Sequence, residues 1–177
     1  MILGLDISTS ITGATVLDKD GKVVFCTAWD MRNKKYFPTL FDKSDFIKDR
    51  IWELDDMFHL EAVYIEQSLQ SFRSGFSSAK TLSTLSRFNG IVSWLCYDII
   101  KIIPEYIAAT SARKKCGIKI PKGQKAKQVV IKYVLDNVPD VPISYTKMGN
   151  PKAGCYDKAD SWVVARAGYN LCIKEQS

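Results

Sequence analysis

The sequence has little of what thiol-based and histidine-based sites need. Among its 177 residues there is one histidine, His59, so a Ser-His-Asp triad or a His-rich metal site would depend on that residue alone. The five cysteines are scattered, none forms a Cys-x-x-Cys pair, and their odd number argues against a complete disulfide framework. We therefore predict reduced thiols in an intracellular protein, and zinc is disfavoured. His59 is expected to end a helix as a surface or capping residue.

Long apolar runs are absent too. No segment approaches about 18 consecutive apolar residues, and no basic region precedes the apolar N-terminal segment. We therefore expect no membrane association and no secretion signal. There is no internal repeat or low-complexity linker, and 46% hydrophobic with 25% charged residues is ordinary for a globular protein. Residues 1–177 are predicted to form a single domain.

The net charge of +6 is modest but unevenly placed. Residues 113–132 contain no acid and eight basic side chains, namely Arg113, Lys114, Lys115, Lys119, Lys122, Lys125, Lys127 and Lys132. A block of this kind is typical of a surface that binds a polyanion such as nucleic acid. The alternative is a solvated basic face without a partner.

The N-terminal third predicts an antiparallel meander of three strands. Ile2–Asp6 is an apolar run that ends on a carboxylate, and residues 14–17 follow as a second strand. An Asp-Gly pair at Gly21 is a strong hairpin signal before a third strand at 22–29. Residues 30–43 are expected to be a loop with added positive charge.

The rest of the chain is predicted to contain both helices and strands. The expected elements are a helix from Ser44, which would cap it, a strand at 62–66, a helix at 79–99, a strand at 105–109, a short basic helix capped by Thr110 or Ser111, a helix at 123–137, a loop at 138–156 and a final helix from about Asp157.

Four carboxylates stand out in this pattern. Asp6 and Glu66 each end an apolar strand, where an unpaired carboxylate is costly unless a cation or hydrogen bonds meet it. Asp157 and Asp160 are three residues apart and so share one helix face. The alternatives are that Asp6 caps a turn, and that Asp157 is an N-cap or a first-turn acid that complements the helix dipole.

Together these acids form an oxygen-only ligand set, which suits Mg²⁺ or Mn²⁺ rather than zinc. Two such ions activate water and stabilise the leaving oxygen in phosphodiester cleavage, and the basic block would neutralise the flanking phosphates. We therefore predict metal-dependent hydrolysis of nucleic acid, with Asp6, Glu66, Asp157 and Asp160 as catalytic metal ligands.

The order of these motifs resembles a known family. Gly4-Leu-Asp6 with Ser10-x-Thr12-Gly13, then Tyr64-Ile-Glu66-Gln67, then Asp157-Lys-Ala-Asp160 is similar to the RuvC-type Holliday-junction resolvases of the RNase H-like superfamily. The resemblance covers nearly the whole chain. It implies an α/β fold with a five-stranded mixed sheet, an antiparallel meander plus parallel strands, flanked by helices.

The resemblance also implies an activity. It predicts a homodimer that binds a four-way DNA junction and makes paired symmetric nicks, leaving a 5′-phosphate and a ligatable 3′-hydroxyl. The implied cofactor is Mg²⁺, two ions per site, with Mn²⁺ as a substitute. The implied location is cytoplasmic or nucleoid-associated.

Further residues carry over from the family pattern onto this chain. Lys125 and Lys127 match basic residues that approach the scissile phosphate, and Arg113, Lys114 and Lys115 extend the expected DNA-binding surface. The loop after Glu66 occupies the place where the family presents an aromatic residue to the junction centre. Asp157 stands where some relatives have histidine. The expected DNA-binding residues of the loop are Phe72, Arg73 and Phe76, with Phe72 the first candidate for the aromatic residue.

The loop residues also have a reading from chemistry alone. Exposed aromatics beside an arginine suit base stacking and phosphate contact. The two phenylalanines could equally fold back onto the core.

Other functions stay open from the sequence. The Asp6 strand with Thr12-Gly13 also resembles the first phosphate motif of actin-like ATPases, but the chain is short and has no second segment of that kind. The same fold also supports nucleases for RNA–DNA hybrids or for flap and branched DNA. A non-catalytic, structure-specific DNA-binding protein is the alternative outside the enzymes, and the intact carboxylate set argues against it.

Overall fold

The computed structural model of the chain describes residues 1–67 and 79–175. At its centre is a five-stranded sheet in the order β3-β2-β1-β4-β5. Strands β1, β2 and β3 are antiparallel neighbours, whereas β4 runs parallel to both β1 and β5. The strands are β1 (Ile2–Asp6), β2 (Ile11–Leu17), β3 (Val23–Asp30), β4 (Ala62–Glu66) and β5 (Glu105–Ile107). The predicted mixed sheet with its N-terminal meander is confirmed.

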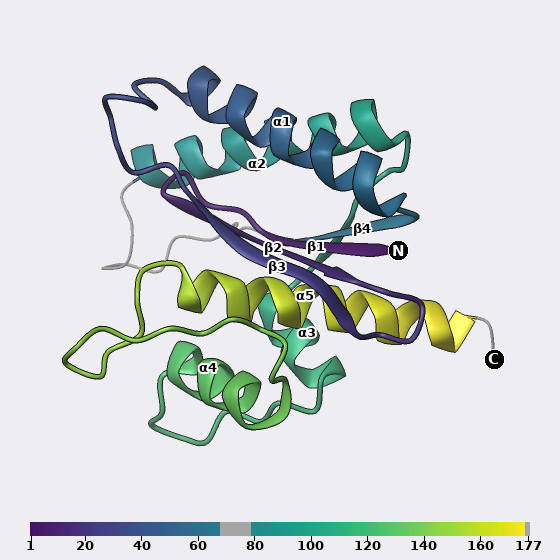
Figure 1. Ribbon diagram of the computed structural model, residues 1–177, viewed down its shortest axis with the longest axis vertical. Coiled ribbons are helices and arrows are strands. Elements are labelled where there is room, and N and C mark those ends of the chain that lie inside the picture. Colours follow the sequence, from purple (N-terminus) through teal and green to yellow (C-terminus); the bar gives the residue numbers. More distant parts are fainter. Residues whose placement is uncertain (68–78, 176–177) are drawn as a thin grey trace.

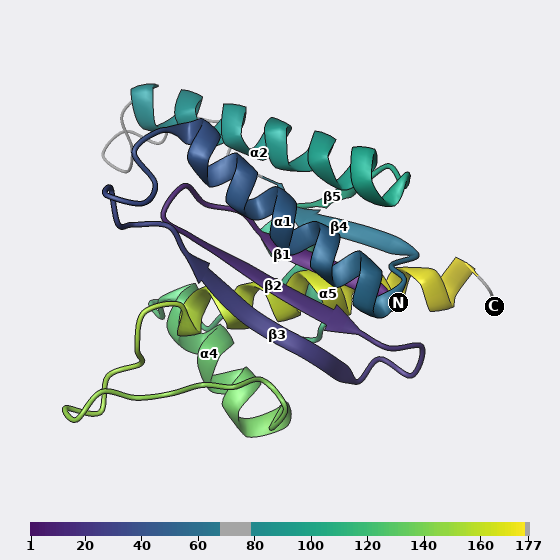
Figure 2. The same ribbon diagram turned by 45° about the horizontal axis from the view of Figure 1, so that its top comes forward.

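Helices cover both faces of this sheet. On one face lie α1 and α2, and on the other lies α5, with α3 and α4 packed on its outer side (Figure 1). The turned view in Figure 2 shows the same layers. The helices are α1 (Leu40–Phe58), α2 (Ala79–Ile100), α3 (Ala109–Lys115), α4 (Ala126–Asn137) and α5 (Cys155–Glu175). Within the described residues, no helix is both long and apolar enough to cross a bilayer.

Strand alternation divides the core into two clusters. On β1, Leu3 and Leu5 are fully buried in the cluster under α1 and α2. Gly4 between them faces α5, and a Cβ on it would lie 2.6 Å from the Cα of Ala165. Successive residues of a strand point to opposite faces. The leucines of β1 therefore pack against α1 and α2, while the glycine lets α5 pack closely on the other face.

Three predicted helix starts were wrong, those of α1, α3 and α4. Helix α1 begins at Leu40 with Thr39 as its N-cap, in a reciprocal capping box with Asp42. Ser44 lies inside the helix, where its hydroxyl donates to the carbonyl of Leu40 at 2.8 Å. Thr39 caps the helix because its side chain reaches the free N–H groups of the first turn, whereas Ser44 lies one turn further into the helix.

Helix α3 begins earlier than predicted as well. Its N-cap is Ala108, which makes no side-chain capping bond, so Thr110 and Ser111 lie within the helix. Helix α4 begins at Ala126 rather than near Gly123, whose φ of +84° places it in the preceding turn.

The structure also places the single histidine and the five cysteines. His59 is the C-cap of α1, with φ of 50° and its N–H donating to the carbonyl of Asp55 at 2.8 Å. The prediction of a capping residue is thus confirmed. All five cysteines are free thiols.

Candidate active site

The sheet topology brings the two strand-end acids together. Strands β1 and β4 are parallel neighbours, with Leu5 paired to Ile65. The next residue of each strand is Asp6 and Glu66, so both acids leave the sheet at the same edge. The carboxyl ends of parallel strands are where α/β proteins commonly build their sites.

A glycine allows the first turn of α5 to reach this edge. Gly13 of β2 pairs with Asp6 of β1. A Cβ on Gly13 would lie 2.0 Å from the carbonyl oxygen of Asp157. Only a residue without a side chain allows the backbone of Asp157 to lie against β2, beside the strand position of Asp6. This glycine therefore positions one pair of acids relative to the other.

Helix α5 is also fixed by a buried polar contact. The hydroxyls of Thr15 on β2 and Ser161 on α5 lie 2.8 Å apart, and both side chains are fully buried. Ser161 also donates to the carbonyl of Lys158 at 2.9 Å. A hydrogen bond in the core fixes the rotation of the helix as well as its position. Asp160, the neighbour of Ser161, is thereby held toward the strand ends.

The pKa of Asp6 reports how close the acids are. Burial raises this pKa well above its ordinary value of 3.8, and the negative charges of Glu66, Asp160 and Asp157 raise it further. The ammonium of Lys127 opposes them and lowers the pKa. Asp6 is therefore the central member of the group, because all three other acids act on it.

The other acids behave in the same way. Burial, and then the charge of Asp160, raises the pKa of Glu66 to about 7. Burial raises the pKa of Asp160 to about 6, with a further contribution from Asp157. Burial likewise raises the pKa of Asp157. The structure thus brings the four sequence-predicted acids into one electrostatic group at one edge of the sheet.

Two of the five described basic candidates act on these acids. Lys127, in the first turn of α4, lowers the pKa of all four carboxyl groups. Arg113, half-buried on α3, lowers the pKa of Glu66 and Asp160. These two cations therefore stand at the border of the carboxylate group.

The remaining basic candidates lie further out. Lys125 is the exposed N-cap of α4. Lys115 ends α3, and its carbonyl accepts a hydrogen bond from Asn170 at 3.0 Å, toward the far end of α5. Since Asn170 is 13 residues beyond Asp157, it lies about 20 Å further along the helix axis. Lys115 is thus separated from the acids.

Lys114 lies in a basic groove next to Arg113. The groove has a volume of about 430 Å³, with Ile118 and Ile120 among its apolar lining and Arg113, Lys114 and Lys119 among its cations. The basic block of the sequence is therefore partly a groove wall rather than a uniformly solvated face.

Arg32 is a cation that the sequence analysis did not include in the site. Its guanidinium pairs with Asp30 at the end of β3, with 2.6 Å between Nη2 and Oδ2. Its charge also lowers the pKa of Asp157. The sequence signal was the positive charge of the 30–43 segment, but only the fold brings the end of β3, and with it Arg32, near the start of α5.

Three predicted DNA-binding residues, Phe72, Arg73 and Phe76, lie outside the described residues. Their roles stay predictions from the sequence.

The chemistry of the donor set fits a hard divalent cation. The acids are oxygen donors that repel one another and have raised pKa values, and a bound cation removes both penalties. Across residues 1–67 and 79–175, no group of three or more His, Cys, Asp or Glu side chains is arranged closely enough to hold a metal ion. The acids therefore share an electrostatic site without forming a closed cage, which is compatible with ions that keep water and phosphate oxygens as ligands.

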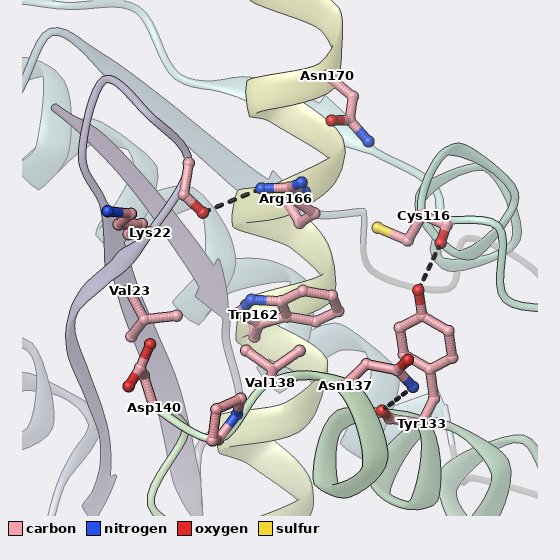
Figure 3. Close-up of a pocket in the computed structure, with 12 residues that line it drawn as sticks. Lys22, Val23, Cys116, Tyr133, Asn137, Val138, Asp140, Trp162, Arg166 and Asn170 are labelled. Carbon is pink, nitrogen blue, oxygen red and sulfur yellow. Dashed lines mark hydrogen bonds between the residues drawn. The ribbon is translucent and has the colours of Figure 1, made fainter.

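A second cavity lies away from the acids. It has a volume of about 340 Å³ and is bordered by the β2–β3 turn, α4 and α5 (Figure 3). Arg166 donates to the carbonyl of Gly21 at 3.0 Å, and the hydroxyl of Tyr133 donates to the carbonyl of Cys116 at 3.3 Å. Arg166 is nine residues beyond Asp157, or about 14 Å along α5. This cavity is therefore separate from the candidate active site.

The arrangement of a mixed five-stranded sheet, covering helices and strand-end acids defines the class: this is the RNase H-like fold of the RuvC-type resolvases. No protein-family model matches the sequence, and no curated protein matches it. Solved structures do match the fold.

RuvC of T. thermophilus in complex with a Holliday junction substrate matches with a TM-score of 0.65 at 13% identity, over 97% of this chain and 94% of that chain. Another structure of Thermus thermophilus RuvC matches with a TM-score of 0.63 at 14% identity, over 98% and 96% of the two chains. The yeast mitochondrial Holliday junction resolvase Ydc2 matches with a TM-score of 0.63 at 14% identity, over 99% of this chain and 80% of that chain. At these identities the likeness establishes the fold alone.

Proposed function

We propose that the protein is a metal-dependent endonuclease that resolves four-way DNA junctions by paired symmetric nicks. One observation carries the proposal: four carboxylates from β1, β4 and α5 converge at one sheet edge beside Lys127 and Arg113. The fold shared with a junction-bound resolvase supports the choice of substrate. The product ends would be a 5′-phosphate and a 3′-hydroxyl.

In this proposal Asp6, Glu66, Asp157 and Asp160 hold two Mg²⁺ ions, for which Mn²⁺ can substitute. When bound, the ions supply Lewis-acid activation of the phosphodiester and of the attacking water. The protein contributes positioning, because the strand ends and the fixed start of α5 bring the four acids to one edge. Lys127, at their border, offsets the charge of the incoming phosphate.

DNA would be held by the surface around this edge. The phosphate contacts would come from Arg113, Lys114, Lys115 and Lys125. The number of these contacts sets the salt dependence of binding. Phe72, with Arg73 and Phe76, would contact the junction centre.

Paired nicks need two sites, so we propose a homodimer. The exposed side of α2 supports this, since Trp94 and Tyr97 are 59% and 47% exposed and a Cβ on Gly90 would meet nothing within 4 Å. Aromatic residues are enriched in protein interfaces.

The test is a comparison of substrates. Wild type, Asp6→Asn and Asp160→Asn are incubated in Mg²⁺ with an immobile four-way junction, a linear duplex, a flap and an RNA–DNA hybrid. The proposal predicts cleavage of the junction by wild type alone. Cleavage of the hybrid or flap instead would keep the site and change the substrate. Tight junction binding without cleavage in Mg²⁺ or Mn²⁺ would refute the enzyme and leave a DNA-binding protein.

A further inference from the structure

Residues 144–152, predicted as loop, form a hairpin that extends beyond the start of α5, on the side of the sheet where α4 and α5 lie (Figures 1 and 2). Tyr145 and Pro151 form an antiparallel bridge. The N–H of Thr146 donates to the carbonyl of Asn150 at 2.8 Å, and Gly149 closes the turn with φ of +77° and a bond to Thr146 at 3.0 Å. These bonds give the segment a defined shape rather than that of an unstructured loop.

The base of the hairpin is attached to the start of α5. Cys155 is buried, and its Sγ lies 3.4 Å from the amide nitrogen of Ser144 and 3.3 Å from its carbonyl oxygen. The ammonium of Lys158 donates to the carbonyl of Pro142 at 3.1 Å. Asp157 lies between these two anchoring residues in the sequence. The position of the hairpin is therefore coupled to that of the catalytic acids.

The tip of the hairpin exposes an apolar side chain between two cationic ones. Met148 is 89% exposed, more than any other large hydrophobic residue among the described positions, and Tyr145 on the same hairpin is 44% exposed. Lys147 and Lys152 flank the tip and are exposed. Residues 141–156 contain no acid. An apolar point flanked by cations is complementary to a groove lined by phosphates.

We propose that this hairpin is a DNA-binding element in which Lys147 and Lys152 contact the backbone of a junction arm while Met148 inserts between bases. Methionine is among the apolar side chains that proteins insert between base steps, partly unstacking them. A branch point interrupts the continuous stacking of a duplex, so the base steps next to it give way more easily than steps within a duplex. This inference rests on the proposed function, because it takes branched DNA as the ligand.

The test uses junctions that carry 2-aminopurine next to the branch point, whose fluorescence rises when its stacking is lost. Met148→Ala, the double variant Lys147→Ala with Lys152→Ala, and wild type are titrated in Ca²⁺. Ile103→Ala is the control, since Ile103 is 77% exposed and precedes β5 at the opposite edge of the sheet.

We expect Met148→Ala to weaken junction binding roughly tenfold and to remove the fluorescence rise. The lysine double variant should reduce the slope of log affinity against log salt by about 2. Ile103→Ala should behave as wild type. Equal affinity, slope and fluorescence in all variants would overturn the inference. So would a Met148→Ala effect confined to self-association in analytical ultracentrifugation, since the tip would then contact a second copy.

Failure of the proposed function can be distinguished from failure of the inference about the hairpin. If wild type binds a linear duplex or an RNA–DNA hybrid but not the junction, the junction-resolving function is wrong. The same variants titrated against that substrate still decide whether the hairpin contacts nucleic acid.

Discussion

Single residues at the candidate site oppose folding in the absence of a cation. Burial and like charges raise the pKa of Asp6, and the pKa of Glu66 rises to about 7. Each carboxyl is therefore less stable as a carboxylate in the folded chain than in the unfolded one. Such a group is typical of a functional site rather than of a stabilising one.

The pH dependence of stability follows from Glu66. An unfolded glutamate titrates near 4.5, and the folded one near 7. Between these values the folded state binds a proton that the unfolded state has lost, so stability falls as pH rises. We expect Glu66→Gln to raise the free energy of unfolding of the metal-free protein at pH 8 by about 1–3 kcal/mol. Urea unfolding in EDTA at pH 5 and pH 8 measures this.

The control is Glu105→Gln, because Glu105 is exposed on β5. This variant should follow wild type at both pH values. Mg²⁺ at pH 8 should stabilise wild type more than Glu66→Gln. A Glu66→Gln protein that is less stable than wild type at pH 8 would contradict the electrostatic account.

Lys127 has the opposite effect on the acids, since it lowers the pKa of all four. Lys127→Ala should therefore raise these pKa values and shift formation of the carboxylates, which in the proposed function bind the cations, to higher pH. We expect the acidic limb of the cleavage rate–pH profile to move up by roughly 0.5–1 pH unit, measured in single turnover with saturating junction. Lys132→Ala, on the same helix, should leave the profile in place. If both variants gave the wild-type profile, Lys127 would have no role in tuning the acids.

Single residues also show how much of the candidate site could be predicted from the sequence alone. Asp6 and Glu66 could be predicted because a carboxylate at the end of an apolar strand is visible in the sequence. The action of Arg32 on Asp157 could not, since it depends on β3 and α5 being brought together in the fold. The anchoring of the 144–152 hairpin by Cys155 is likewise a tertiary contact without a local pattern.

At the scale of elements, the position of α5 on the sheet decides whether the acids meet. This position depends on Gly13, which contacts the backbone of Asp157. The strands could be predicted because their apolar runs and Asp-Gly turn are local signals. The starts of α1 and α3 could not be placed as well. Several residues near the start of α1 can cap a helix, and α3 follows Ala108, which has no capping side chain to recognise in the sequence.

Gly13→Ala tests the position of α5. A Cβ at this site would lie 2.0 Å from the carbonyl oxygen of Asp157, so the first turn of α5 must move away. We expect a loss of about 1–3 kcal/mol in the free energy of unfolding, together with loss of cleavage. Gly90→Ala is the matched control, since Gly90 lies within helix α2 and a Cβ on it would meet nothing within 4 Å. It should stabilise the protein by about 0.5–1 kcal/mol. Because Gly90 lies on the α2 face proposed as the dimer interface, this variant is a control for stability and not for cleavage. Equal effects of the two substitutions would contradict the account.

At the scale of the whole molecule, the site is made by topology. Parallel pairing of β1 and β4 and the antiparallel return of β2 bring Asp6, Glu66 and Asp157 to one edge, although they are far apart in the sequence. The fold could be predicted because the order of the acidic motifs resembles a known family, and the sheet order confirms it. The direction in which the 144–152 hairpin extends could not be predicted, because nothing in the local sequence fixes it.

The most direct measurement uses a supercoiled plasmid that extrudes a cruciform, incubated with the protein in Mg²⁺. The account predicts linear plasmid as the main product, because two sites of one dimer nick opposite strands of the junction within one binding event, and it predicts no product with Asp6→Asn. The linear ends should be hairpins that a ligase seals. A protein that binds the cruciform but leaves the plasmid supercoiled in both Mg²⁺ and Mn²⁺ would contradict the central claim.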